Sequence, residues 1–197
     1  MAVQKFPTPT TTEAVRQFLG LAGYYRSFVR DFAKKASPMF QLLKKDVPFQ
    51  WGAEEDQAFH KFKEDLTNSP CLAYPDFSKR FILCTDASIQ GLGAVLMQED
   101  NRGKLQPIAY ASRQLKAAEN NYFVTDIEPL AVVWSLTSFK DFIYGYNIEV
   151  YTDHKPLTGL FKDRLLSGRR ARWKCIIDNY NPSLHYLQGK LNATADA

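Results

Sequence analysis

The chain has 197 residues, of which 45% are hydrophobic and 14% aromatic, and its net charge is +4. This length and hydrophobic content suffice for one ordinary domain and a smaller one, and the aromatic content excludes a disordered chain. No apolar run approaches the roughly 20 residues that cross a bilayer, and the N-terminus lacks a signal-peptide pattern. The mildly basic charge permits a polyanionic partner without requiring one.

The cysteines and histidines exclude a zinc site. The three cysteines are odd in number and scattered, which fits reduced thiols in a reducing, intracellular compartment. The three histidines are far from them and from one another, so no zinc-ligand spacing exists. These residues are Cys71, Cys84, Cys175, His60, His154 and His185.

Residues 1–75 are predicted to be helical. Thr12 is a plausible N-cap, and apolar residues recur at helical spacing from Val15 to Phe32. Ser37-Pro38 should break this run before a short helix over residues 39–45, and another helix is expected over residues 53–68. Tyr74-Pro75-Asp76 predicts a domain boundary, which divides the chain into residues 1–75 and 76–197.

Three residues of the first helix share one face, since Arg16, Gly20 and Tyr24 are spaced by four. A glycine inside a helix costs up to about 1 kcal/mol relative to alanine, so something is expected to approach the backbone closely there. The pattern fits a nucleic-acid contact and an ordinary amphipathic helix with a solvated basic side equally well.

Residues 76–197 are predicted to form an α/β fold with a mixed sheet. Two apolar strands joined by a turn come first, over residues 81–96, and a third strand is expected over residues 105–112. A long buried helix should begin at Asn120 or Asn121 and end near Phe142. After this helix we expect, in order, a strand over 148–153, a short helix over 156–161, a basic helix that ends near Tyr180 and a last strand over 183–188.

Four carboxylates stand where elements of this sheet can converge: Asp86, Glu128, Asp153 and Asp196. A lone aspartate at a strand end is more often a cap or a turn residue, but Asp86 and Asp153 each follow a strand-like run and a threonine. Oxygen ligands are those that Mg²⁺ prefers, and carboxylates this close need cations between them.

The chain resembles the polymerase of gypsy-type long-terminal-repeat retrotransposons, in its thumb or connection region followed by its ribonuclease H domain. The resemblance rests on motifs that occur in order along the chain: residues 18–28 (FLGLAGYYRSF), Phe49-Gln50-Trp51, Thr85-Asp86-Ala87-Ser88, residues 126–133 (DIEPLAVV), residues 151–157 (YTDHKPL) and residues 192–196 (NATAD). Each is weak alone, and together they are specific.

This resemblance implies a ribonuclease H-like mixed five-stranded sheet flanked by helices, preceded by a small helical thumb or connection region. It implies cleavage of the RNA strand of RNA/DNA hybrids, with Asp86, Glu128, Asp153 and Asp196 as catalytic residues that hold two Mg²⁺ ions, or Mn²⁺ in their place. The expected partners are the hybrid and the fingers, palm and integrase regions of the same polyprotein, with no membrane. The expected location is the cytoplasm or a virus-like particle.

Two surfaces are predicted to contact the hybrid. The basic segment over residues 162–174, with Arg169, Arg170 and Arg172, would bind phosphates without reading sequence, unless it is only a solvated helix face. By resemblance, Arg16, Gly20 and Tyr24 would form a thumb-helix track along the minor groove.

Several features depart from the family pattern. Residues 187–192 carry no histidine before the last aspartate, and the chain has no Tyr-x-Asp-Asp text, so no polymerase activity is expected of it. Pro129 follows Glu128 and is tolerated only in a first helical turn, which should place Glu128 at or near a helix start. The domain is expected to be cut short after Asp196, which would then hold its ion weakly. The alternatives are a catalytically silent structural module and an integrase-like strand transferase.

Overall fold

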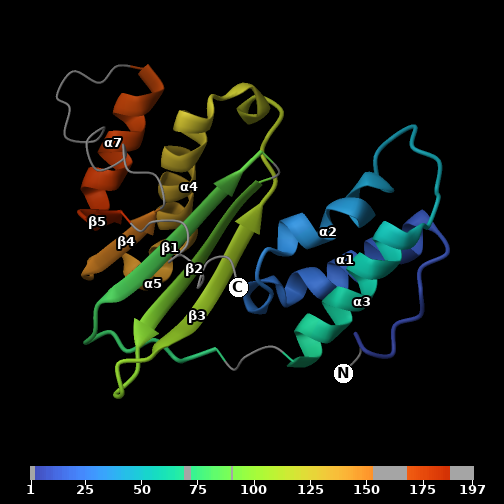
Figure 1. Cartoon of the computed structure of the whole chain (residues 1–197), viewed down its shortest axis with the longest axis horizontal. Helices are drawn as coiled ribbons and strands as arrows, with labels where there is room; N and C mark the ends of the chain where they lie inside the picture. The colour runs from blue at the N-terminus through green and yellow to red at the C-terminus, as the bar shows by residue number, and fades with distance from the viewer. Residues whose placement is uncertain (1–2, 69–71, 90, 153–167, 187–197) are drawn as a thin grey trace.

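The structure, a computed structural model, describes residues 3–68, 72–89, 91–152 and 168–186 (Figure 1). The helices, with η denoting a 3-10 turn, are α1 (Thr12–Tyr24), η1 (Arg26–Phe28), α2 (Phe32–Gln41), α3 (Ala53–Asn68), η2 (Glu119–Asn121), α4 (Val124–Ser138), α5 (Lys140–Ile143) and α7 (Gly168–Tyr180). The strands are β1 (Phe81–Ser88), β2 (Gly91–Glu99), β3 (Leu105–Arg113), β4 (Ile148–Thr152) and β5 (Ser183–Tyr186). Within these ranges no helix combines the length and the apolar character needed to cross a bilayer.

The five strands form one sheet in the order β3-β2-β1-β4-β5. β2 runs antiparallel to β1 and to β3, whereas β4 runs parallel to β1 and to β5. The predicted α/β mixed five-stranded sheet, flanked by helices and preceded by a helical region, is therefore confirmed. Because four of the strands point the same way, the C-terminal ends of β1, β3, β4 and β5 meet at one edge, called here the site edge.

The two faces of the sheet have different covers. Alternate residues of β1 point to opposite faces. Phe81 and Leu83 belong to the main apolar core, which also contains Leu130 of α4 and Trp173 of α7. Ile82 and Cys84 lie on the other face, in a smaller cluster with Val95 and Met97. Figure 1 shows α1, α2 and α3 on the β3 side of the sheet, where η1 and α2 contact β3.

The helical region has an apolar core of its own, built largely of aromatic rings from α1, α2 and α3, such as Phe18, Phe32, Phe59 and Phe62. It differs from expectation in three places. The first helix ends at Tyr24 and does not run on to Phe32. Thr11, rather than Thr12, caps α1, because its Oγ1 accepts a hydrogen bond from Ala14 N at 3.2 Å. Pro38 lies inside α2 and does not end it. The boundary at residues 75 and 76 stays a prediction.

The helical segment that contains Glu128 also differs from the single helix predicted over residues 120–142. Phe123 is extended, with φ −64° and ψ 150°, so η2 and α4 are separate, and α5 follows α4 as a distinct turn. α4 begins at Val124, four residues before Glu128, which places Pro129 beyond the first turn. The expectation that Pro129 lies in the first turn was wrong, whereas Glu128 lies one turn in, near the start of α4. Most helix stability comes from tertiary packing, and the buried apolar residues of α4 provide it despite the proline.

Ser112, near the end of β3, joins the helical region to the sheet. Its Oγ accepts a hydrogen bond from Ala33 N at 2.9 Å, and its carbonyl oxygen accepts one from Arg26 Nη2 at 3.0 Å. Asp31 precedes α2, and among the described residues its side chain makes no capping bond. The sheet therefore supplies a cap that α2 does not supply itself.

Candidate functional site

Asp86 lies on β1 close to the site edge and is half-buried. Its neighbour across β2 is Gly93, whose own neighbour across β3 is Ser112. A Cβ at Gly93 would lie 3.1 Å from Asp31 Oδ1 and 4.0 Å from the Cβ of Asp86. The absence of a side chain at Gly93 thus lets Asp31, from the helical region, approach the face of the sheet that carries Asp86.

A small hollow opens beside Asp86 on this face. Its lining includes Arg30 and Asp31 from the helical region and Cys84 and Tyr110 from the sheet. Burial raises the pKa of the Cys84 thiol to about 11, although the nearby Arg30 guanidinium lowers it in part. The thiol is therefore protonated at neutral pH, which argues against Cys84 as a nucleophile.

Glu128 comes to the same edge from the opposite face. The chain passes from the C-terminal end of β3 through η2 into α4, so α4 begins at the site edge, as Figure 1 shows, and runs back across β1. Glu128 lies near that beginning and is only 7% exposed. Two of the four predicted carboxylates, Asp86 and Glu128, thus lie on neighbouring elements at one edge of the sheet.

The other two predicted carboxylates, Asp153 and Asp196, lie outside the described residues. β4 is described as far as Thr152, which is buried and ends the strand at the site edge. Within the ranges that the structure describes, no three potential metal-ligating side chains gather in one place. The four-carboxylate set therefore stays a prediction.

Sequence reasoning missed the role of Asp126, which lies in the first turn of α4. Arg169 Nη2 lies 2.6 Å from Asp126 Oδ2, and Arg170 Nη2 lies 2.7 Å from Asp126 Oδ1. Both arginines belong to α7 and had been expected to contact phosphates. The signal in the sequence was a carboxylate within an otherwise apolar, buried helix, which needs a cationic partner.

Arg169 is also stacked on aromatic rings. Its guanidinium carbon lies 3.7 Å from the centroid of the Tyr122 ring and 5.3 Å from that of Trp173. Burial works against the charge of Arg169, but hydrogen bonds with Asp126 and Tyr122 outweigh it and raise the pKa of Arg169 above its ordinary value. Its contacts among the described residues are those of a structural cation.

The remaining predicted nucleic-acid contacts lie on accessible surface. Tyr24 is 81% exposed, and Gly20 is exposed, so that a Cβ added there would meet no described atom within 4 Å. Arg16 is exposed and forms an ion pair with Glu13 at 3.1 Å. Arg172 is exposed on α7. Their part in binding stays a prediction.

His185 takes a packing role in the described structure. Its ring stacks on Tyr151 of the neighbouring strand β4, with centroids 4.9 Å apart and an interplanar angle of 20°. This matches the expectation that it has a core or edge role, since the stacking places it in the sheet.

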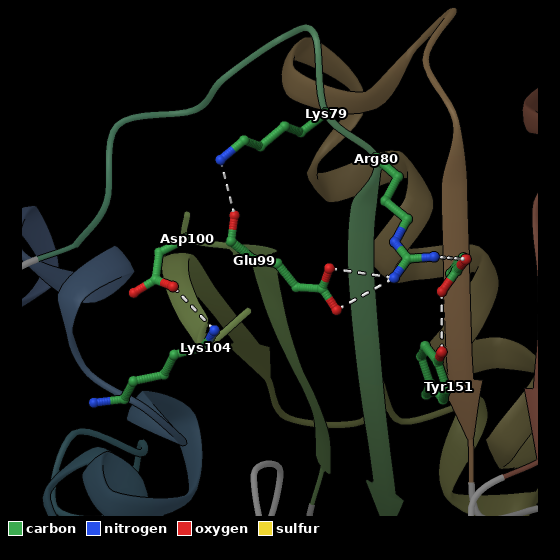
Figure 2. Close-up of polar contacts among 7 residues, drawn as sticks. Lys79, Arg80, Glu99, Asp100, Lys104 and Tyr151 are labelled. Atoms are coloured by element: carbon green, nitrogen blue, oxygen red, sulfur yellow. Dashed lines mark hydrogen bonds and ion pairs between the residues drawn. The ribbon is translucent and has the colours of Figure 1, made fainter. Parts of the chain in front are cut away.

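The edge of the sheet opposite the site edge carries a different polar cluster (Figure 2). Arg80, just before β1, contacts Glu99 Oε1 at 3.2 Å and Glu149 Oε1 at 2.9 Å. Lys79 Nζ donates to the Glu99 carbonyl oxygen at 3.2 Å, and the Tyr151 hydroxyl donates to Glu149 Oε2 at 3.0 Å. Arg80 is exposed and the other side chains are half-buried. None of them is a predicted site residue.

The sequence is similar to curated retroelement proteins along its whole length. It is 42% identical over 195 residues to the retrovirus-related Pol polyprotein from transposon 412 of Drosophila melanogaster, which covers 99% of this chain and 16% of that protein. It is 41% identical over 209 residues to the retrovirus-related Pol polyprotein from transposon gypsy of the same organism, and the match covers 100% of this chain and 20% of that protein. The Tf2-3 polyprotein of Schizosaccharomyces pombe is 34% identical over 199 residues, covering 99% and 15%. The chain thus spans about a fifth or less of these relatives.

Solved structures share the fold. A foamy viral protease-reverse transcriptase in complex with double-stranded DNA matches with a TM-score of 0.75 and 21% identity, over 95% of this chain and 34% of that one. The same kind of protein in complex with an RNA/DNA hybrid matches with a TM-score of 0.73 and 22% identity, over 95% and 26%. The family described as "RNase H-like domain found in reverse transcriptase" matches residues 51–150. The chain therefore belongs to the family of RNase H-like domains found in reverse transcriptases, and its curated relatives are retrotransposon Pol polyproteins.

Proposed function

We propose that this chain is the nuclease portion of a retrotransposon reverse transcriptase and hydrolyses the RNA strand of RNA/DNA hybrids. The observation that carries the proposal is the arrival of Asp86 and Glu128 at one edge of the sheet, from β1 and α4. Family membership supports the reaction class, and the identity of about 40% to Pol polyproteins supports the setting.

The donor set fits a hard divalent cation. Asp86 and Glu128 offer carboxylate oxygens, which Mg²⁺ and Mn²⁺ accept, and Asp153 follows directly on β4, the parallel neighbour of β1. With Asp196 they would hold two ions, which supply an activated water and neutralise charge on the scissile phosphate. The chain itself orients these oxygens, with Asp86 fixed by the strand register and Glu128 by the buried start of α4.

We propose that accessible residues of α1 and α7 bind the hybrid. Arg172 would contact phosphates, and Arg16, Gly20 and Tyr24 would lie along the minor groove as a second contact. We expect Arg172→Ala to lower the slope of log affinity against log salt by about one, because one phosphate contact is lost. Filter binding between low and moderate salt measures this slope, and an unchanged slope would assign Arg172 to solvent.

The decisive experiment is a gel assay with matched RNA/DNA, DNA/DNA and RNA/RNA duplexes and a Mg²⁺ titration. We expect cleavage of the RNA strand of the hybrid alone, dependent on Mg²⁺ and abolished by EDTA. Asp86→Asn should abolish cleavage and leave hybrid binding intact, because the amide keeps the size of the side chain and removes a charge from the proposed ion site.

Asp178→Asn is the matched control, because it makes the same chemical change at an exposed ion pair on α7. It should cleave like the wild type. Cleavage by Asp86→Asn at saturating Mg²⁺ would refute the site. A wild type that binds the hybrid and never cleaves it would identify a silent structural module, and strand joining on DNA would identify an integrase-like transferase.

A further inference from the structure

We infer that Arg169 and Arg170 are positioning residues for Glu128, acting through Asp126. Together the three residues Asp126, Arg169 and Arg170 form what is called here the Asp126 cluster. The inference rests on the proposed function, since it assigns a task to the start of α4. It replaces phosphate binding as the main role of the two arginines.

The geometry gives each carboxylate oxygen its own arginine. Arg169 Nη2 donates to Oδ2 at 2.6 Å, and Arg170 Nε donates to Oδ1 at 2.8 Å. Charge-assisted bonds of this length are about twice as strong as neutral ones. With a donor on each oxygen, the Asp126 carboxylate is held against rotation and fixed relative to α7.

Burial makes the arrangement obligatory. The Asp126 side chain is 5% exposed, whereas those of Arg169 and Arg170 are 35% and 38% exposed. A carboxylate without water must find cations in the protein, but a partly exposed guanidinium can be hydrated. Asp126 therefore depends on the arginines to compensate its charge, whereas the arginines can be hydrated without Asp126.

Helix electrostatics favour the same arrangement. Three arginines occupy the first turns of α7, where the helix dipole disfavours cations, and α7 has no acidic residue there. Asp126 lies in the first turn of its own helix, where an anion is favourable. Its carboxylate thus serves the N-termini of two helices and ties them together at the site edge.

The position of Glu128 follows from that of Asp126. Asp126 and Glu128 are two residues apart on α4, about 3 Å along the helix axis, so a shift of the first turn moves both. A second ion pair holds the segment before α4, because Arg113 at the end of β3 contacts Glu119 at 2.6 Å. The chain around Glu128 is therefore fixed to β3 on one side and to α7 on the other.

The surroundings of Arg169 agree with this role. It is held between Asp126 and the rings of Tyr122 and Trp173, and Trp173 belongs to the main core. A guanidinium that stacks on aromatic faces and pairs with a buried carboxylate has its main contacts within the protein, although part of it stays exposed. Lys174 on the same helix pairs with the exposed Asp178 at 2.8 Å and serves as the internal contrast.

The test compares Asp126→Asn, Arg169→Gln and Arg169→Lys with the wild type and with Asp178→Asn, in the whole chain. Amide hydrogen exchange is measured over residues 125–131, and Mn²⁺ affinity is measured by electron paramagnetic resonance without substrate. We expect faster exchange at the start of α4 in Asp126→Asn and Arg169→Gln. Mn²⁺ binding should be weaker by about 10- to 100-fold, the range typical of losing a group that orients a metal ligand. Arg169→Lys should retain part of both, because it keeps the charge.

Hybrid binding in EDTA separates positioning from phosphate contact. Positioning predicts that Asp126→Asn and Arg169→Gln leave the salt slope of hybrid affinity unchanged. A slope lowered by about one in Arg169→Gln, with exchange and Mn²⁺ affinity like the wild type, would overturn the inference. Equal exchange in all variants would overturn it as well. A wild type that binds no Mn²⁺ would refute the proposed function, and the exchange data would then decide the inference independently.

Discussion

The two edges of the sheet use the same residue types for ion pairs in different surroundings. At the site edge, Asp126 and Glu119 are buried and each is bound by arginine at 2.6 Å. At the opposite edge, Arg80 bridges Glu99 and Glu149 with longer distances, and its side chain is 49% exposed (Figure 2).

Burial, rather than the number of contacts, decides what such pairs contribute. An exposed pair gains little, because water and salt screen it and two long side chains must be ordered. A buried pair is costly to form, but breaking it leaves an uncompensated charge. Losing one partner of an ion pair at the site edge should therefore cost much stability, whereas losing one at the opposite edge should cost little.

The largest effect is expected from Arg169→Ala combined with Arg170→Ala. Removing both cations leaves the Asp126 carboxylate buried without a counter-ion, which should lower the free energy of unfolding by about 3–5 kcal/mol. Urea unfolding at neutral pH measures it. Arg172→Ala, on the same helix but outside the Asp126 cluster, should leave the unfolding midpoint in place. A double variant as stable as the wild type would remove the distinction between the two edges.

Glu119→Gln should have the next largest effect, roughly 1–3 kcal/mol of unfolding free energy, because Arg113 and Lys116 N lose a charged acceptor. Burial works to raise the pKa of Glu119, but these hydrogen bonds outweigh it and lower it below the usual 4.5. The stabilisation is therefore complete above about pH 4.5 and is lost as the pH falls through the lower folded value.

Urea unfolding of Glu119→Gln and the wild type across this pH range tests the sign. The two curves should stay parallel at neutral pH and converge in acid. A difference that grew as the pH fell would show that Glu119 is protonated in the folded protein at moderate pH.

Ser112→Ala should cost about 1 kcal/mol, because Ala33 N loses its hydrogen-bond acceptor at the start of α2. This serine joins the helical region to the site edge, so the loss should appear as faster hydrogen exchange in the first turn of α2. Exchange that rose equally throughout the sheet would mean that Ser112 stabilises β3 and not the junction.

The smallest effect is expected from Arg80→Ala. When Arg80 is removed, Glu99 stays partly exposed to water and Glu149 still accepts the hydrogen bond from the Tyr151 hydroxyl. The urea midpoint should therefore not shift measurably at neutral pH or with added salt. A shift comparable with that of Glu119→Gln would show that exposure does not separate the two edges.

The sequence by itself determined the five strands and the helix α3. Alternating and apolar runs predicted the strands, and with them the place of Asp86 on β1, and helical spacing predicted the bounds of α3, because these depend on local spacing and turn residues. The family resemblance also came from short local motifs, and the match to residues 51–150 confirmed it. Helix ends were less well predicted: Pro38 and Pro129 lie inside helices because tertiary packing compensates for their missing N–H groups.

Only the tertiary structure decided what the polar side chains do. Arg169 and Arg170 looked like phosphate ligands in a basic segment, yet they bind Asp126, which is 43 and 44 residues away. Likewise, the cap of α2 comes from Ser112, 79 residues beyond Ala33. No periodicity or spacing encodes such pairings, because the partners meet only once the sheet and its helices have packed, and burial then fixes which charges must be satisfied.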